Sequence, residues 1–258
     1  PSFEPSQLAE QWESIRQDKA APLLNRATQG LYPPGSTLKV VTLAAMLSQR
    51  PDLATNSYHC SGQLALPGYT VHCPRAHGEL DLASALAVSC NVTFSQLGLK
   101  LGNAGLAKQA EQACFNSDML FELPTAKSSW PKGNTGDGEI AQRALGQGQV
   151  LVTPLQMALV AAGIANGGVI YRPYLVQERH LGGRISARTQ PEKMATFVSS
   201  EVAASITDMM VEVTKRGTGR GAALSGVQVA GKTGTAENPH GAPHAWYIGF
   251  APADRPRV

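Results

Sequence analysis

The sequence predicts an α+β fold, in which an antiparallel sheet is flanked by helices and joined to a mostly helical subdomain. Three observations predict it. An apolar run of helical length fills residues 40–47, further helical patterns follow between residues 80 and 165, and two strand patterns occur at residues 227–237 and 245–250. The 258 residues are 43% apolar and 16% charged, which supplies enough apolar material for one large domain.

The charge of the chain is small and scattered. The formal net charge is +3, and the densest basic pair is Lys215-Arg216, so nucleic acid is not expected as a partner. No apolar stretch approaches the roughly 20 residues that span a bilayer, and the first residues do not resemble a signal sequence. We therefore expect any export signal or membrane anchor to lie outside this chain.

The apolar run at residues 40–47 predicts a core helix. Two prolines and a glycine precede Ser36, so this serine is expected at the mouth of a helix that is enclosed on all sides. Lys39 lies three residues later, on the same face as Ser36. An N-cap serine with a lysine reaching to water is the alternative, but the helix dipole disfavours a cation in the first turn. A buried, neutral Lys39 would instead take a proton from the Ser36 hydroxyl.

A second Ser-x-x-Lys pattern, Ser129-Trp130-Pro131-Lys132, provides a comparison within the chain. Proline is disfavoured inside a helix, so Ser129 and Lys132 are not expected to share a helical face. We predict that this pattern lies in a loop without a catalytic role.

The remaining elements follow in order from periodicity and from capping or turn residues. Residues 1–31 form a polar arm with a short amphipathic helix near residues 8–15. Asp81 is expected to cap a helix over residues 82–88, and Thr153-Pro154 to start another over residues 155–165. The other predicted elements are helices at 92–98, 104–113 and 199–215, an irregular segment at 116–138 and a strand at 174–178.

Four cysteines are present, two of which, Cys60 and Cys73, flank a turn-rich stretch that can bring them together. A disulfide between them is the preferred interpretation, and reduced thiols come next. A zinc site with neighbouring histidines (His59, His72, His77) is least favoured, because no tight Cys-x-x-Cys pair is present. We therefore predict neither a metal nor a cofactor.

Two further short patterns carry polar side chains at exposed positions. Ser89-Cys90-Asn91 lies between two predicted helices, where a turn with capping side chains is the common alternative. Lys232-Thr233-Gly234 lies on the first of two strands that we expect to pair antiparallel. Its glycine has no side chain to block an extended peptide, although an edge strand protected by a lysine is equally consistent with this pattern.

Ser-x-x-Lys, Ser-x-Asn and Lys-Thr-Gly, in this order, resemble the signature motifs of penicillin-binding proteins and serine β-lactamases. The wider sequence is similar to the transpeptidase domain of class B penicillin-binding proteins. The similarity is carried by residues 32–42 (Tyr-Pro-Pro-Gly-Ser-Thr-Leu-Lys-Val-Val-Thr), 145–158 (Leu-Gly-Gln-Gly-Gln-Val-Leu-Val-Thr-Pro-Leu-Gln-Met-Ala), 231–237 (Gly-Lys-Thr-Gly-Thr-Ala-Glu) and 245–252 (Ala-Trp-Tyr-Ile-Gly-Phe-Ala-Pro).

The resemblance implies a role for each motif. Ser36 would attack the carbonyl between the two terminal D-alanines of a peptidoglycan stem peptide, with Lys39 as general base. Ser89 would pass a proton to the leaving amine, held by Asn91 and the third-motif lysine. The substrate carboxylate would bind residues of the third motif (Lys232, Thr233, Gly234, Thr235). The backbone amides of Ser36 and Thr235 would form the oxyanion hole.

The resemblance also implies a single transpeptidase domain over residues 1–258. We expect a helical subdomain at about 52–165 and sheet-side elements at about 170–258, with the core helix at 36–49 between them. Because the family has strands beyond both ends of this chain, we expect the chain to be trimmed and its sheet to be incomplete. The implied ligands and partners are stem peptides, β-lactam antibiotics and membrane-anchored cell-wall synthesis proteins, outside the cytoplasm in the periplasm or on the outer face of the membrane.

Three alternative functions share these motifs. A serine β-lactamase is disfavoured, because residues 92–231 contain no Glu-x-x-Leu-Asn loop and because the class with a modified lysine typically has valine at the position of Asn91. A D,D-carboxypeptidase, which uses water as acceptor, shares every motif. A β-lactam receptor that is acylated once and signals would share them as well.

Overall fold

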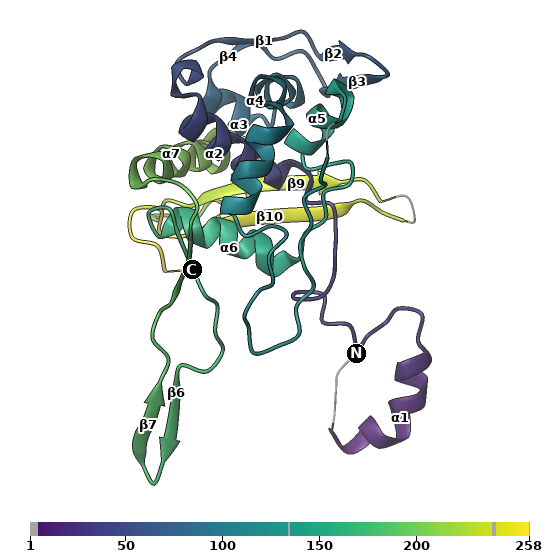
Figure 1. Cartoon of the computed structure of the whole chain (residues 1–258), viewed down its shortest axis with the longest axis vertical. Helices are drawn as coiled ribbons and strands as arrows, with labels where there is room; N and C mark the ends of the chain where they lie inside the picture. Colours follow the sequence, from purple (N-terminus) through teal and green to yellow (C-terminus); the bar gives the residue numbers. More distant parts are fainter. Residues whose placement is uncertain (1–4, 134, 239–240, 258) are drawn as a thin grey trace.

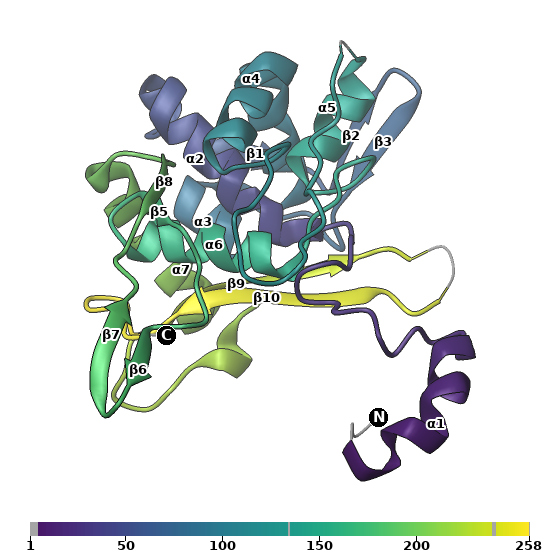
Figure 2. The ribbon, with the colours of Figure 1, turned by 60° about the horizontal axis from the view of Figure 1, so that its bottom comes forward.

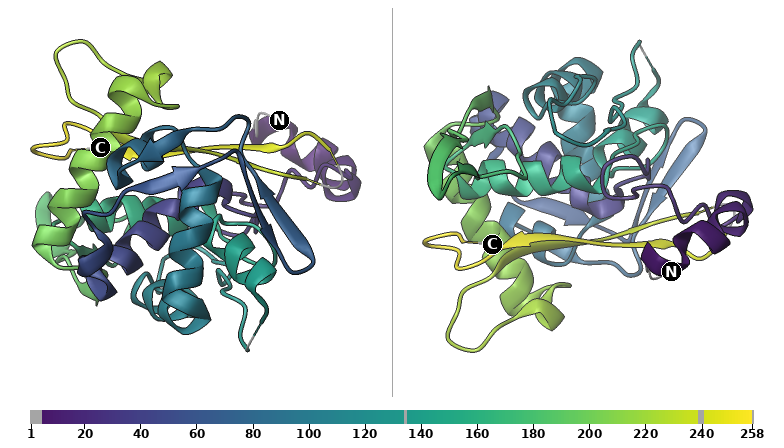
Figure 3. Two further views of the ribbon diagram at one scale, coloured as in Figure 1. Left: turned by 90° about the horizontal axis from the view of Figure 1, so that it is seen from above. Right: turned by 90° about the horizontal axis from the view of Figure 1, so that it is seen from below.

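Helices and short strand pairs build the molecule around one long pair of strands. The computed structural model describes residues 5–133, 135–238 and 241–257. Strand β9 (Ala230–Ala236) pairs with β10 (His244–Phe250), and most helices lie on one side of this pair (Figures 1 and 2). Helix α1 (Pro5–Gln17), predicted near residues 8–15, stands apart from the helical body in Figures 1 and 2 and overlaps one end of the β9–β10 pair in the views of Figure 3. The combination of helices with antiparallel strand pairs confirms the α+β fold class.

The predicted core helix is formed, with one difference at its start. A 3₁₀ turn, η1 (Gly35–Leu38), precedes α2 (Lys39–Gln49). Ser36 therefore lies on the tighter turn, where side chains three residues apart eclipse one another. Residues 39–46 are all buried, and α2 packs against two further helices, α4 (Asn91–Gln112) and α7 (Ser200–Arg216). The prediction of a helix enclosed on all sides is confirmed.

Three helices begin where the sequence predicts, at Asp81, expected as a cap, and at Thr153 and Ser199, expected as helix starts. Side-chain oxygens of Asp81, Thr153 and Ser199 accept hydrogen bonds from backbone N–H groups. These bonds satisfy backbone N–H groups of the first helical turn, which have no hydrogen-bond partner within the helix. They fix the starts of α3 (Leu82–Ala87), α6 (Pro154–Ala165) and α7.

Helix α4 contains both helical patterns predicted after Cys90. Gly102, with a φ of 67°, interrupts its helical geometry between them. Among the described helices, none is both long and apolar enough to cross a membrane.

Helix α5 (Asp137–Ala144) was not predicted. Ile140 is its only large apolar side chain, so the sequence shows no apolar stripe. A salt bridge from Arg143 to Glu139, one turn apart, spans 3.2 Å and supports the helix.

Within the described residues, the shorter strands form four antiparallel pairs. The pairs are β1 (Tyr58–Cys60) with β4 (Gly78–Leu80), β2 (Gln63–Leu66) with β3 (Tyr69–His72), β5 (Val169–Tyr171) with β8 (Lys193–Thr196), and β6 (Glu178–Leu181) with β7 (Arg184–Arg188). The predicted strand at 174–178 is wrong, because residues 174–176 are exposed and β6 begins only at Glu178. Two 3₁₀ turns, η2 (Pro51–Leu53) and η3 (Arg220–Ala222), complete the elements.

Glycines allow β9 to pack directly against the turn that carries Ser36. A Cβ atom on Gly234 would lie 2.9 Å from Cγ2 of Thr37, and one on Gly35, whose φ is 54°, would lie 2.5 Å from the carbonyl oxygen of Thr235. A side chain at either position would separate the strand from the turn. The Trp246 indole on β10 holds the same region by donating a 3.0 Å hydrogen bond to the Pro33 carbonyl.

Candidate active site

The fold brings the first two motifs into direct contact. The Lys39 Nζ atom, at the start of α2, donates hydrogen bonds to the carbonyl oxygen of Ser89 at 2.7 Å and to its Oγ at 3.1 Å. It also donates to Oδ1 of Asn91 at 2.7 Å. Asn91 is held in turn because its Nδ2 donates to the His72 carbonyl at 2.7 Å. The buried amine is thus surrounded by oxygen acceptors.

The third motif reaches the same serine. Lys232 Nζ donates to Ser89 Oγ at 3.0 Å and to the Thr233 carbonyl at 2.8 Å. The Ser89 hydroxyl therefore lies between two lysine amines that come from a helix and a strand. Ser89 has a φ of 57°, in the left-handed region, and this turn between α3 and α4 aims its side chain at both amines.

Ser36 lies half-buried on η1, one turn before Lys39. The backbone around it is fixed by a hydrogen bond from the Gly35 amide to the Gly146 carbonyl at 2.9 Å and by one from the Thr37 hydroxyl to the Pro34 carbonyl at 2.7 Å. The hydrogen bonds of the Lys39 amine go to the second motif, and its backbone N–H donates to the carbonyl oxygens of Ser36 and Thr37. The spacing nevertheless keeps Ser36 and Lys39 on one side of the turn.

Burial governs the charge of the two lysines. It lowers the pKa of Lys39 to about 7, against a smaller opposing effect of the Cys90 and Cys73 thiols. It also lowers the pKa of Lys232 well below its usual range, and the nearby Lys39 charge lowers it further. Since two adjacent cations repel each other, a neutral Lys39 favours the charge on Lys232.

The strand of the third motif presents side chains of unequal exposure. Thr233 is half-buried and Thr235 is exposed. Gly234 faces η1, so its missing side chain permits internal packing, whereas the sequence interpretation assigned it to the approach of a peptide. Thr218 was missed by sequence analysis, and its Oγ1 lies 2.6 Å from Oγ1 of Thr233. In the sequence, only its position in the glycine-rich loop that follows residues 199–215 distinguished Thr218 from other threonines.

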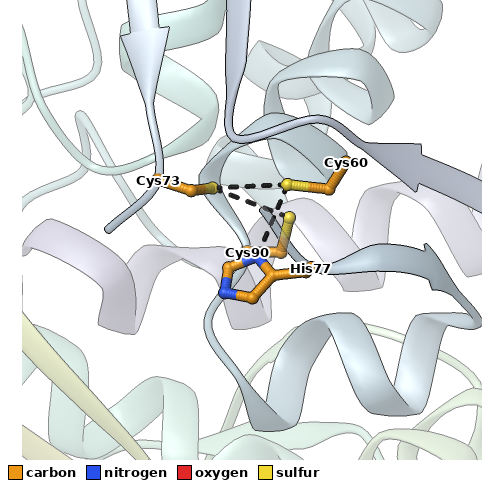
Figure 4. A group of neighbouring side chains, drawn as sticks. All are labelled: Cys60, Cys73, His77 and Cys90. Atoms are coloured by element: carbon orange, nitrogen blue, oxygen red, sulfur yellow. Dashed lines mark hydrogen bonds between the residues drawn. The ribbon is translucent and has the colours of Figure 1, made fainter. Parts of the chain in front are cut away.

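The cysteines are free thiols, which corrects the preferred disulfide between Cys60 and Cys73. The two sulfurs do lie close together, 3.8 Å apart, and Cys90 Sγ lies 3.8 Å from Cys73 Sγ. A hydrogen bond from Cys90 is the largest contribution that lowers the pKa of Cys73 to about 5. Of the three histidines considered from the sequence, His77 joins this group (Figure 4), whereas His59 and His72 are exposed.

The second Ser-x-x-Lys pattern lies outside a helix, as predicted. Ser129 pairs through its backbone with Leu151 in an isolated bridge, and residues 131–133 have no regular helical structure. The pattern therefore has the sequence of the first motif without its geometry.

Comparison with known proteins gives one consistent result. The family model described as penicillin binding protein transpeptidase domain matches residues 1–258. The chain is 39% identical to the peptidoglycan D,D-transpeptidase PbpA of Mycolicibacterium smegmatis, with 100% of this chain and 56% of that protein covered. The chain thus spans about half the length of the curated relatives it matches.

Solved structures agree with this similarity. Penicillin-binding protein A of M. tuberculosis, solved as a ceftriaxone acyl-enzyme complex, matches with a TM-score of 0.89 and 36% identity over 99% of this chain and 60% of that chain. A chain from a peptidoglycan synthase complex, described for its coordination of polymerization and crosslinking, matches with a TM-score of 0.85 and 32% identity. That match covers 98% of this chain and 46% of the other.

Proposed function

The chain belongs to the penicillin-binding protein transpeptidase family, and from this premise we propose that it is a serine-type peptidoglycan D,D-transpeptidase. It would cross-link stem peptides through an acyl-enzyme on Ser36 and be inhibited by β-lactams. One observation carries the proposal: the Ser89 hydroxyl lies 3.1 Å from Lys39 Nζ and 3.0 Å from Lys232 Nζ. A hydroxyl held between two amines is suited to moving protons during acyl transfer.

In the first half-reaction, Ser36 Oγ bonds to the carbonyl carbon between the two D-alanines while its proton moves to neutral Lys39. The carbon–nitrogen bond then breaks. The leaving amine takes the Ser89 proton, and a lysine amine replaces that proton through its hydrogen bond to Ser89 Oγ. Amides of Ser36 and Thr235 would stabilise the oxyanion. An amine of a second stem peptide would then take the acyl group and free Ser36.

The substrate carboxylate would bind along β9. Lys232 supplies the positive charge and is fixed by its bond to the Thr233 carbonyl. The hydroxyls of Thr233 and Thr235 supply donors on the more accessible side of the strand. Asn91 would act with Lys39, because its Oδ1 orients that amine toward the second motif.

The proposal is tested by intact mass spectrometry after incubation with benzylpenicillin. A long-lived adduct of one β-lactam per chain supports it, whereas a rapidly hydrolysed adduct would indicate a β-lactamase. A peptide ending in D-alanyl-D-alanine, given with and without an amine acceptor, separates the remaining alternatives. Acyl transfer to the amine supports the transpeptidase, release by water alone indicates the carboxypeptidase, and the absence of turnover indicates a receptor.

We expect the rate of acylation to depend on pH through Lys39. The neutral amine is the base, and the pKa is lowered to about 7, so the active form predominates above this pH. The rate should fall about tenfold for each pH unit below 7 and level off above 8. Initial rates of adduct formation between pH 5 and 9, with folding followed by circular dichroism, check this. A flat profile would contradict it.

Ser129→Ala should leave the acylation rate unchanged within about twofold. Its backbone pairs with Leu151, and those hydrogen bonds do not need the side chain. Adduct formation is measured as for the unmodified chain. A large loss of rate would mean that the second Ser-x-x-Lys pattern contributes to the chemistry.

The cellular setting follows from the proposed substrate. Peptidoglycan lies outside the cytoplasm, so we place the domain in the periplasm or on the outer face of the cytoplasmic membrane. The match to a peptidoglycan synthase complex supports cell-wall synthesis proteins as partners of the whole protein. Such partners would include membrane-anchored proteins.

A further inference from the structure

A group of cysteine and histidine side chains, of the types that bind metals, includes the middle residue of the second motif and takes no part in the proposed chemistry. Cys60 ends β1, Cys73 follows β3, His77 precedes β4 and Cys90 caps α4 (Figure 4). Three sulfurs and one imidazole nitrogen from these four segments lie within 4.8 Å of one another. The cluster is enclosed, because Cys60 and Cys90 are buried and the other two side chains are half-buried.

Three of the six distances between these atoms match those around a tetrahedral zinc ion, and all six are within 4.8 Å. With Zn–S bonds of about 2.3 Å and Zn–N bonds of about 2.0 Å, two sulfurs lie about 3.8 Å apart, and a sulfur and a nitrogen about 3.5 Å apart. Cys60 Sγ and Cys73 Sγ are separated by 3.8 Å, as are Cys73 Sγ and Cys90 Sγ. Nδ1 of His77 lies 3.4 Å from Cys60 Sγ. We propose that Cys60, Cys73, His77 and Cys90 bind one structural zinc ion.

A disulfide would account for only part of this group. It would join two of the sulfurs and leave the third cysteine and His77 without a function at the same point. Three thiolates and one imidazole in an enclosed site form a common ligand set of structural zinc, which prefers four sulfur and nitrogen ligands. All four side chains then have one role, and binding releases the thiol protons to solvent.

The backbone already supplies the outer contacts that such a site needs. The Val92 amide donates to Cys73 Sγ at 3.5 Å, and the Thr93 amide donates to Cys90 Sγ at 3.4 Å. The Thr93 hydroxyl adds a bond to Cys90 Sγ at 3.2 Å. These donors lie at the start of α4, where the helix dipole also favours negative charge. Hydrogen bonds of this kind orient and stabilise metal-bound thiolates.

The site would position the second motif. Cys90 stands between Ser89 and Asn91, which accept the described hydrogen bonds of the Lys39 amine. Zinc would tie this turn to the strand ends around β1 and β3, and so hold the Ser89 hydroxyl between the two lysines. The ligands would act as positioning residues and would not contact substrate.

The metal itself provides the first test, and its readout does not depend on activity. The chain, purified from zinc-supplemented medium and desalted, should retain about one zinc per chain by elemental mass spectrometry. Cys73→Ser should reduce the content at least tenfold, while Cys114→Ser, which alters the cysteine outside the cluster, should leave it unchanged. Zinc retained in full by Cys73→Ser, or absent from the unmodified chain, would overturn the proposal.

Two measurements keep the test decisive if Cys73→Ser does not fold. Cobalt bound to the unmodified chain should show thiolate charge-transfer bands and the visible spectrum of a tetrahedral site. His77→Cys, which still supplies four ligands, should retain the metal. Alkylation in denaturant should label all four cysteines, and labelling of only two would show that a disulfide forms instead.

The positioning role rests on the proposed function and is measured separately. Removal of zinc by a chelator should slow acylation by benzylpenicillin about tenfold or more, and added zinc should restore the rate. An unchanged rate in the zinc-free chain would refute the positioning role. Loss of acylation that zinc does not restore would count against it equally.

Discussion

Ser36→Ala is expected to abolish the covalent adduct with benzylpenicillin. The hydroxyl oxygen is the atom that bonds to the β-lactam carbonyl in the proposed mechanism, and nothing in an alanine can replace it. The acylation rate should fall by about 10⁴-fold or more, as with other serine nucleophiles. Ser36 is half-buried on η1, and its substitution removes one oxygen without opening a large cavity, so the variant should fold normally. Intact mass spectrometry over several hours measures the loss.

The matched control is Ser129→Ala, because it removes the same atom from the same sequence pattern in a different geometry. Its adduct should form at the rate of the unmodified chain. A full adduct on Ser36→Ala would place the nucleophile elsewhere, and peptide mapping would then identify the residue that carries it.

Local sequence chemistry was enough to predict several elements. Asp81, Thr153 and Ser199 were expected at helix starts, and each accepts a backbone hydrogen bond there. The burial of α2 on all sides also followed from its apolar residues. Such features depend on neighbours within one or two turns, so a single sequence contains the required information.

Long-range proximity was not predictable in the same way. Ser89 lies 50 residues from Lys39 and 143 residues from Lys232, and residue types alone did not show that the three side chains meet. The motif resemblance supplied that expectation. Thr218 had no recognised motif and was missed, although it contacts Thr233.

The cysteine cluster shows the same limit. Zinc ranked last from the sequence because its ligands do not occur as tight pairs. The pairing of β1 with β4 brings His77 to Cys60, whose carbonyl accepts a hydrogen bond from the His77 amide at 3.1 Å. The turn before α4 then adds Cys90. Only the folded chain assembles the four ligands.

Lys39→Met should reduce the acylation rate by about 10²–10⁴-fold, the usual contribution of a general base. Methionine fills most of the volume of the lysine stem, so α2 can keep its packing while the amine is lost. The rate is followed by mass spectrometry at pH 8, where the unmodified base is largely neutral. The weak residual activity should also lose the pH dependence expected near pH 7. A variant that keeps both the rate and the profile would remove Lys39 from the mechanism.

The stability of Lys39→Met distinguishes a catalytic lysine from a structural one. Its hydrogen bonds to Ser89 and Asn91 are lost, which costs about 1–3 kcal/mol for acceptors left unpaired in a buried site. Removing the amine offsets part of this cost, because the amine itself is desolvated in the folded state and an apolar side chain of similar length is not. The free energy of unfolding in urea should therefore change little at neutral pH. A fall of more than about 4 kcal/mol, a size typical of structural damage, would mean that the lost activity reflects a damaged fold and not a missing base.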